Sequence, residues 1–281
     1  MRDPIYRFKP AGYNPPPERR SYPEPDQRLR EVFEEWFEEV ENINYLYPPN
    51  LHNLALDLTK DLEPNIPEAH SLLLAYQDHP RIELAGYFLS AIYNQSDETN
   101  IDFDLDLEIP LDGLGYKLHK GKRLDIYGTA GNYTGEYASG DLFIHGRTGH
   151  WTGQHASGNV IIDENGTAGH YTGQYASGNV IIRGTAGHYT GRYASGNVVI
   201  DENGTAGDYT GEESSGNMII YGRVGDCTGR KSTGLVIQGG TGGKYTGQFA
   251  SGVVIILSET DMFVGDWMTG VLLALKRPNS F

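Results

Sequence analysis

Three histidines recur at the same position of successive sequence repeats and could together bind a metal ion. They are His150, His170 and His188, and the column continues with Asp208 and Asp226. Neighbouring repeats would bring imidazole and carboxylate groups within reach of one ion. Repetition alone produces the same column, however, and the chain lacks the mixed Cys/His spacing of zinc sites. We therefore interpret the column as surface residues and assign no metal and no cofactor.

A run of acidic residues offers a second candidate cation site. Asp102, Asp104, Asp106 and Glu108 alternate with apolar residues over 101–109. Carboxylates are calcium ligands, but the run lacks the glycine and the spacing of an EF-hand loop. The alternation is instead typical of a strand with one solvated face.

Two further motifs fail on their own residues. The segment 239–244 reads Gly-Gly-Thr-Gly-Gly-Lys and looks like a phosphate loop, but Gln238 stands where its first glycine belongs and Tyr245 where Ser or Thr belongs. The chain has no Gly-x-Ser-x-Gly elbow, and its single cysteine, Cys227, lies inside the repeat where Tyr is usual. We find no catalytic constellation and predict that the chain is not an enzyme.

The elements that would position these residues belong to one repeated unit. Each unit closes with a glycine, and the closing glycines are 18 or 20 residues apart. The runs between them are β-branched, such as Val160-Ile161-Ile162, which predicts short strands with Val160 and Ile162 on one face and Ile161 on the other. Periods near 20 residues are typical of solenoids. The closing glycines are Gly140, Gly158, Gly178, Gly196, Gly216, Gly234, Gly252 and Gly270.

Two units are longer, and both gain their extra residues at one corner. The insertions are Asp-Glu-Asn-Gly at 163–166 and at 201–204. Asn-Gly favours a protruding turn with positive φ. We expect two acidic turns on one edge of the solenoid, two coils apart.

The glycine pattern resembles the GXGXG repeat domain, which ends the large subunit of glutamate synthase and also forms one of the subunits of formylmethanofuran dehydrogenase. The resemblance covers a little over half the chain and implies a right-handed parallel β-helix that serves as a scaffold without catalytic residues. The repeat and the helical spacing upstream of it predict a mainly β fold of about eight 18–20-residue coils with an N-terminal α-helical cap. The matching glycines include Gly131 and Gly135, Gly169 and Gly173, Gly187 and Gly191, Gly207 and Gly211, Gly225 and Gly229, and Gly243 and Gly247.

Aromatic residues form two further columns. One is Tyr133, Trp151, Tyr171, Tyr189, Tyr209, Cys227, Tyr245 and Phe263, and the other is Tyr137, His155, Tyr175, Tyr193, Glu213, Lys231, Phe249 and Trp267. Stacked rings one coil apart stabilise a solenoid. An exposed aromatic ladder could also bind sugar rings, but we favour packing.

Charge divides the chain into three parts: an extended basic Pro-rich arm (1–26), an acidic α-helical cap region (27–117) and the repeat domain (118–281). The chain carries a formal net charge of −15, nearly all of it in the middle part, where we predict helices over 28–42, 67–77 and 80–94. An acidic surface suits a basic partner, or is simply solvated. The arm is either a disordered leader or a docking arm for RNA or protein. Its partner-binding candidates are Arg2, Tyr6, Arg7, Phe8, Lys9, Arg19 and Arg20.

The last coil has little sequence left to cover it, so we expect self-association, as a homodimer, through that end or through the N-terminal helices. The interface candidates are Trp267, Met268, Leu272, Leu273 and Leu275. One cysteine fits a reducing compartment, and no apolar run or signal peptide indicates a membrane or secretion. We expect a cytoplasmic protein.

These features predict a non-catalytic assembly or docking protein. Its solenoid would be a rigid scaffold, and its arm and helices would contact a larger assembly, for example an RNA–protein complex such as a ribosomal subunit. Two alternatives stay open: an accessory scaffold subunit of a glutamate synthase-like or formylmethanofuran dehydrogenase-like oxidoreductase, and a glycan-binding solenoid that uses the aromatic ladders. We expect neither DNA nor a membrane as partner.

Overall fold

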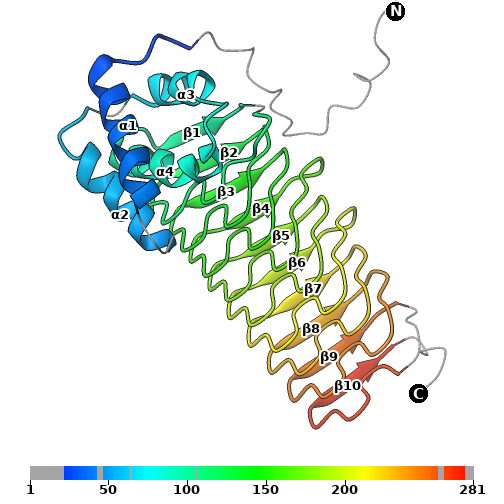
Figure 1. The fold of residues 1–281 in the computed structure, drawn as a ribbon. Helices are drawn as coiled ribbons and strands as arrows, with labels where there is room; N and C mark the ends of the chain where they lie inside the picture. Colours follow the sequence, from blue (N-terminus) through cyan, green and yellow to red (C-terminus); the bar gives the residue numbers. More distant parts are fainter. Residues whose placement is uncertain (1–21, 43–46, 64, 106, 259–262, 276–281) are drawn as a thin grey trace, which may run out of the picture.

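A computed structural model describes residues 22–42, 47–63, 65–105, 107–258 and 263–275, and Figure 1 shows a rod with a helical region at its N-terminal end. The helices are α1 (Gln27–Asn42), α2 (Pro48–Thr59), α3 (Ile66–Ala75), the short 3-10 helix η2 (Ile82–Leu84) and α4 (Ala85–Gln95). The three predicted helices are confirmed within a few residues. Helix α2 was not predicted, because the two prolines at its start argue against a helix. They lie in its first turn, where helices tolerate proline.

The rod is a β-solenoid whose strands form one ten-stranded parallel sheet in sequence order, which confirms the predicted fold class. Each strand pairs with the equivalent strand of the next coil, as Val160 pairs with Val180. The strands are β1 (Asn100–Phe103), β2 (Arg123–Ile126), β3 (Asp141–Ile144), β4 (Val160–Ile162), β5 (Val180–Ile182), β6 (Val198–Ile200), β7 (Met218–Ile220), β8 (Leu235–Gln238), β9 (Val253–Ile256) and β10 (Val271–Ala274).

The core of the rod consists of the two inward columns that the alternation predicts. Val160 and Ile162 are fully buried, and the same positions of β2 to β9 hold Leu, Val, Met or Ile with one exception, while β1 has Phe103 and β10 has Ala274. One inward position breaks the pattern, because Gln238 replaces the isoleucine that would follow Ile220.

Glycine serves the coil in two different ways. Gly173 has φ of 67°, in the left-handed region that favours glycine. Gly178 has no positive φ, but a Cβ placed on it would lie 2.0 Å from the carbonyl oxygen of Gly158. The closing glycine therefore recurs because successive coils approach each other too closely for a side chain.

Helix α4 packs against the first coil of the rod. A Cβ on Gly86 would lie 2.2 Å from the carbonyl oxygen of Asp112, so the two backbones are in close contact. Ser90 Oγ accepts a hydrogen bond from the backbone N–H of Tyr116 (3.1 Å), and Asn94 Oδ1 accepts one from the backbone N–H of His119 (2.9 Å). These bonds satisfy backbone groups of the first coil that have no preceding coil to pair with.

The parallel sheet begins at Asn100, inside the segment that the sequence assigns to the helical region. The strand predicted over 101–109 is shorter than expected and ends at Phe103. Its alternation persists beyond the strand, since Leu105 and Leu107 are also buried. The C-terminal end of the predicted arm contacts this region, where the Tyr22 hydroxyl donates a hydrogen bond to Asp104.

The acidic insertions at 163–166 and 201–204 are turns, as predicted, but the expected positive φ is wrong. Neither the Asn nor the Gly of the two insertions has a positive φ. The turn at 163–166 is closed by a hydrogen bond from the N–H of Gly166 to the carbonyl oxygen of Asp163 (2.8 Å). A Cβ on Gly166 would lie 2.1 Å from the carbonyl oxygen of Ile144, so close approach to the preceding coil selects this glycine.

Candidate functional site

The histidine column is occupied by hydrogen bonds between coils. The Nδ1 atom of His150 accepts the backbone N–H of His170, and Nδ1 of His170 accepts that of His188, both at 2.9 Å. Nδ1 of His188 accepts the N–H of Asp208 in the same way (2.8 Å). An Nδ1 that accepts carries no proton, so the proton of the neutral ring is on Nε2.

The same geometry argues against a shared metal ion. The rings of His150, His170 and His188 stack in nearly parallel planes with centroids 4.9 Å apart, so equivalent nitrogens are too far apart to converge on one ion. Among the residues that the structure describes, no group of three His, Cys, Asp or Glu side chains could hold a metal. Burial lowers the pKa of His170, and the neighbouring His150 and His188 lower it further.

The two aromatic columns are stacked ladders. Tyr171 and Tyr189 lie 5.0 Å apart between ring centroids, and Tyr175 and Tyr193 lie 4.8 Å apart. Where rings stack, their faces cover each other and their edges face solvent. The second column is stacked only from Tyr137 to Tyr193, and beyond Glu213 and Lys231 its Phe249 and Trp267 are 43% and 73% exposed. Sugar rings stack on aromatic faces, so this arrangement favours the packing interpretation.

Sequence reasoning missed the backbone conformation of these ladders. Every residue of both columns has a positive φ, between 55° and 67°. The left-handed conformation costs a non-glycine residue about 1 to 2 kcal/mol, while an aromatic pair contributes about 0.5 to 1.5 kcal/mol. These magnitudes are similar, so stacking offsets much of the backbone strain.

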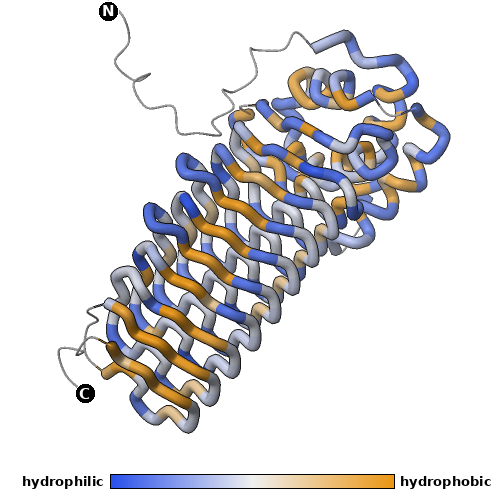
Figure 2. Tube along the Cα trace, turned by 180° about the vertical axis from the view of Figure 1, so that it is seen from behind, coloured by the Kyte–Doolittle hydropathy of each residue, from blue (hydrophilic) through white to orange (hydrophobic). Residues whose placement is uncertain are grey.

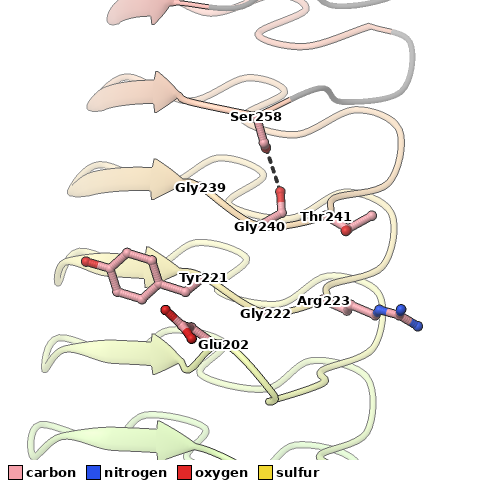
Figure 3. A pocket seen from close by; sticks show the side chains of 8 residues that line it. All are labelled: Glu202, Tyr221, Gly222, Arg223, Gly239, Gly240, Thr241 and Ser258. Atoms are coloured by element: carbon pink, nitrogen blue, oxygen red, sulfur yellow. Dashed lines mark hydrogen bonds between the residues drawn. The ribbon is translucent and has the colours of Figure 1, made fainter.

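A shallow groove crosses the rod beside the second acidic turn, and Figure 3 shows its lining. The carboxylate of Glu202 points toward the ring of Tyr221, whereas the side chain of Arg223 points away from both. Ser258 Oγ donates a hydrogen bond to the carbonyl oxygen of Gly240 (2.5 Å), so this hydroxyl is already engaged. The groove therefore brings no nucleophile, base and acid together.

The segment 239–244 does not form a phosphate loop. Thr241 forms a β-bridge with Arg223 of the preceding coil, and the N–H of Lys244 is bonded to Asp226 Oδ1 (2.8 Å). No helix follows the segment within the described residues, so the helix N-terminus of a phosphate loop is missing. Of the acidic run at 102–108, Asp106 lies outside the described residues, and Asp104 accepts a hydrogen bond from Tyr22.

The outer face of the sheet is the most distinctive surface of the rod. The second-to-last residue of each strand from β3 to β10 lies on the outward face, and all eight are apolar, with Ile161 the most buried at 8% exposed. Figure 2 shows the hydrophobic colour that runs across the strands as far as the C-terminal end. Outward positions of a solvated sheet are normally polar, so this column marks a surface that another apolar surface can cover. The column is Phe143, Ile161, Ile181, Val199, Ile219, Ile237, Ile255 and Leu273.

A ladder of amides flanks the apolar column on one side. Asn179 Nδ2 donates to Asn159 Oδ1 (2.8 Å), and Asn197 Nδ2 donates to Asn179 Oδ1 (3.0 Å). The ladder ends at Asn217, and the next coils carry Leu235, Val253 and Val271 in its place.

A column of ionic side chains flanks the other side. Arg183 lies between Asp163 (4.0 Å) and Asp201 (3.6 Å), which are the first residues of the two acidic turns. Upstream, the two ring nitrogens of His145 lie 2.9 Å from Asp125 and 2.9 Å from Asp163. Burial works against the charged ring, but the hydrogen bonds to the two carboxylates prevail and raise the pKa of His145. This column also turns apolar toward the C-terminal end, where it holds Leu257 and Leu275.

The oligomer-interface candidates do not form one surface. Leu273 and Leu275 point outward from β10 and are 50% and 76% exposed. Leu272 packs against the core at the C-terminal end of the rod, and Met268 is partly buried as well. Trp267, at 73% exposed, ends the second aromatic column. Leu273 and Leu275 thus belong to the outer sheet face, whereas the other three belong to the end of the rod.

The helical region contributes an acidic surface. Helix α1 buries Leu29, Val32, Phe33, Trp36, Phe37 and Val40 and exposes its glutamates. The partner-binding candidates of the arm, Arg2, Tyr6, Arg7, Phe8, Lys9, Arg19 and Arg20, lie outside the described residues.

Comparisons of the chain with protein-family models, with curated proteins and with solved structures each find no match. Every helix in the described part of the chain is too short or too polar to span a lipid bilayer.

Proposed function

We propose that this chain is a non-catalytic assembly protein. Its β-solenoid is a rigid scaffold in the cytoplasm, and its outer surfaces join it to a second copy and to a larger macromolecular assembly. The observation that carries the proposal is the outer sheet face, where an apolar column runs from β3 to β10. An amide ladder flanks it from β4 to β7, and an ionic column flanks it from β3 to β6. The inward columns form the core of the rod, whereas the outward column, apart from the buried Ile161, is left partly exposed.

The groups capable of chemistry support the same proposal. The histidines of the column bind backbone N–H groups, the aromatic rings stack on each other, and the asparagines bond to one another. These side chains stabilise the rod and are not arranged around a common point. The glycine pattern also supports kinship with the GXGXG scaffold domain, and an oxidoreductase partner chain would be the natural context of that kinship.

The acidic face of α1 supports a basic partner. Glu35, Glu38 and Glu41 are exposed on this helix. A cluster of exposed carboxylates repels nucleic acid and attracts cationic protein surfaces. We therefore propose that the helical end contacts a basic protein of the assembly, and that the basic arm makes a separate contact.

Affinity capture with three versions of the chain tests the proposal. They are the full chain, a chain that begins at Tyr22 and so keeps the Tyr22–Asp104 hydrogen bond, and the triple variant Glu35→Gln/Glu38→Gln/Glu41→Gln. We expect the full chain to capture a basic protein or an RNA–protein assembly, and the triple variant to capture several-fold less at low salt.

Other outcomes discriminate between the alternatives. Co-purification with a flavin or iron–sulfur subunit, independent of the arm and of the three glutamates, would instead make the chain a scaffold subunit of an oxidoreductase. Binding on a sugar array would favour a glycan-binding solenoid. Turnover of a substrate by the purified chain alone would reject a non-catalytic role.

A further inference from the structure

We propose that the outer face of the sheet is covered by a second copy of the same chain, with the two rods side by side and parallel. The inference deepens the proposed function and rests on it, because it names the partner and the surface of the homodimer. It places the interface along the side of the rod, from β3 to β10, rather than at its open end or at the helices.

The shape of the apolar column indicates a flat and long occupant. Its residues from Ile161 to Ile255 are β-branched and recur once in every coil, so they form one straight apolar column, in which Ile161 is buried and the others are half-buried. Two sheets that pack face to face interdigitate such β-branched residues at a separation of about 10 Å. A second rod offers a face of the same length, the same repeat and the same residue types.

The area of the face agrees with a dimer that uses its full length. Five residues of a strand span about 17 Å, and eight strands span about 38 Å, so one face measures roughly 600 Å². Stable interfaces bury about 800 Å² per partner, with some near 600 Å². The three C-terminal strands alone would supply only about a third of this area, so they are insufficient by themselves.

The flanking columns determine the relative direction of the two rods. A two-fold axis along the rods places the ionic column of one copy opposite the amide ladder of the other. Arg183 then faces Asn179, and Asp201 faces Asn197. Each amide retains one N–H and one carbonyl lone pair beyond its ladder bond, so it can meet either a carboxylate or a guanidinium group. Near the C-terminal end, Leu257 faces Val253, and apolar side chains meet apolar side chains.

The antiparallel arrangement buries charge without compensation. Full overlap would then place Leu257 opposite Asp163, and Val271 opposite Asp141. Burying a carboxylate against an apolar side chain is strongly unfavourable. The interface also cannot extend to β2, because Asp125 pairs with Phe143 and takes the place of the apolar residue there. Its carboxylate would face Asp125 of the second copy.

Charge placed in the apolar column tests the inference first. We expect light scattering of the full chain at about 50 µM to give twice the 31.0 kDa of one chain, and Ile255→Lys to give one chain with an unchanged circular-dichroism spectrum. The matched control is Thr241→Lys, on another side of the next-to-last repeat, which should leave the dimer intact. A 31.0 kDa wild-type chain would overturn the inference, as would an Ile255→Lys dimer.

Cross-linking tests the direction of the rods without weakening the face. Two variants carry a single cysteine in the apolar column, Ile181→Cys and Ile255→Cys, each with Cys227→Ser. Packed sheets are too far apart for a disulfide, so a short bis-maleimide is the reagent. In the parallel pair both positions lie on the two-fold axis, and both variants should give covalent dimers. The control Thr241→Cys, also with Cys227→Ser, should not.

The outcomes separate the inference from the proposed function. If neither column variant cross-links and Thr241→Cys does, the side-by-side arrangement is wrong. If neither column variant cross-links but the chain is a dimer, the outer faces of two parallel rods are not paired, and the inference is also wrong. In each of these cases the capture of an assembly by the acidic helix is unaffected, because it is measured with different variants.

Discussion

Side chains at single positions of the rod deviate from the repeat, and the deviations are buried. Gln238 is fully buried in the inward column, and neither atom of its amide has a hydrogen-bond partner among the described residues. Glu136 is 8% exposed, and its Oε2 atom likewise has no partner there. The repeat predicts an isoleucine at the position of Gln238. At the position of Glu136, the next two coils have glutamine, Gln154 and Gln174. Each deviation therefore has a reference residue in the same chain.

Replacing Gln238 by isoleucine should stabilise the rod. The substitution restores the residue type of the column and removes an unpaired buried amide, which costs about 1 to 3 kcal/mol. We expect the free energy of unfolding in urea to rise by about that amount. The reciprocal variant Ile220→Gln, one coil upstream, should lower it by about 2 to 4 kcal/mol. Destabilisation by both variants would show that the Gln238 amide is satisfied in solution.

Glu136 should make stability depend on pH near neutrality. Burial raises the pKa of Glu136 to about 7, and the charge of Lys117 offsets only part of this effect. The folded chain then binds the proton more tightly than the unfolded chain, whose glutamate has a pKa of 4.5. The contribution of the protonated Glu136 to the free energy of unfolding is thus fully present below pH 4.5 and is lost as the pH rises through about 7.

The variant Glu136→Gln removes this dependence. We expect it to raise the free energy of unfolding by about 1 to 2 kcal/mol at pH 8 and to leave it nearly unchanged at pH 4. Urea titrations at both pH values provide the measurement. Glu164→Gln, an exposed glutamate of the first acidic turn, is the matched control and should have no effect at either pH. Equal gains at both pH values would assign the effect to packing rather than to charge.

At the scale of the element, each coil is held by ladders that run along the rod. The inward Val and Ile columns and the closing glycines could be predicted, because they repeat in register and each has one physical cause. The positive φ of the aromatic columns could not, since Tyr and Trp rarely adopt it. Cys227 adopts it without a stacked ring, and the backbone N–H of Cys227, like that of Tyr171, bonds to the next coil, so contacts between coils impose this conformation. The charged triad of Asp163, Arg183 and Asp201 was missed too, because its members lie 18 to 20 residues apart and meet only when the coils stack.

The gap at Cys227 tests the ladder directly. Ring pairs stack from Tyr133 to Tyr209 and again at Tyr245 and Phe263, and Cys227 lies between Tyr209 and Tyr245. Its φ of 58° matches that of its aromatic neighbours. Cys227→Tyr should therefore complete the ladder and raise the free energy of unfolding in urea by about 1 kcal/mol. Cys227→Ala is the control, and a tyrosine variant no more stable than alanine would contradict the stacking account.

At the scale of the whole molecule, the rod separates a helical, acidic end from an apolar side. Charge and helical spacing in the sequence predict the helical, acidic end, and the alternation within each strand predicts which strand residues point outward. It did not indicate that the outward column is a continuous surface, because in one coil a single outward isoleucine is unremarkable. Only the register of ten parallel strands aligns eight such residues. Helix α4 packs against the first coil, whereas β10 has one strand neighbour, β9, in the described part of the chain.

Small-angle X-ray scattering of the full chain tests the side-by-side scaffold most directly, since it measures mass and length in one experiment. The account predicts the mass of two chains with the maximum dimension of one rod and a cross-section about twice as large. Two chains with nearly twice the length would place the interface at an end of the rod, through β10 or the helices. The mass of one chain at every concentration, or a doubled length, would contradict the account.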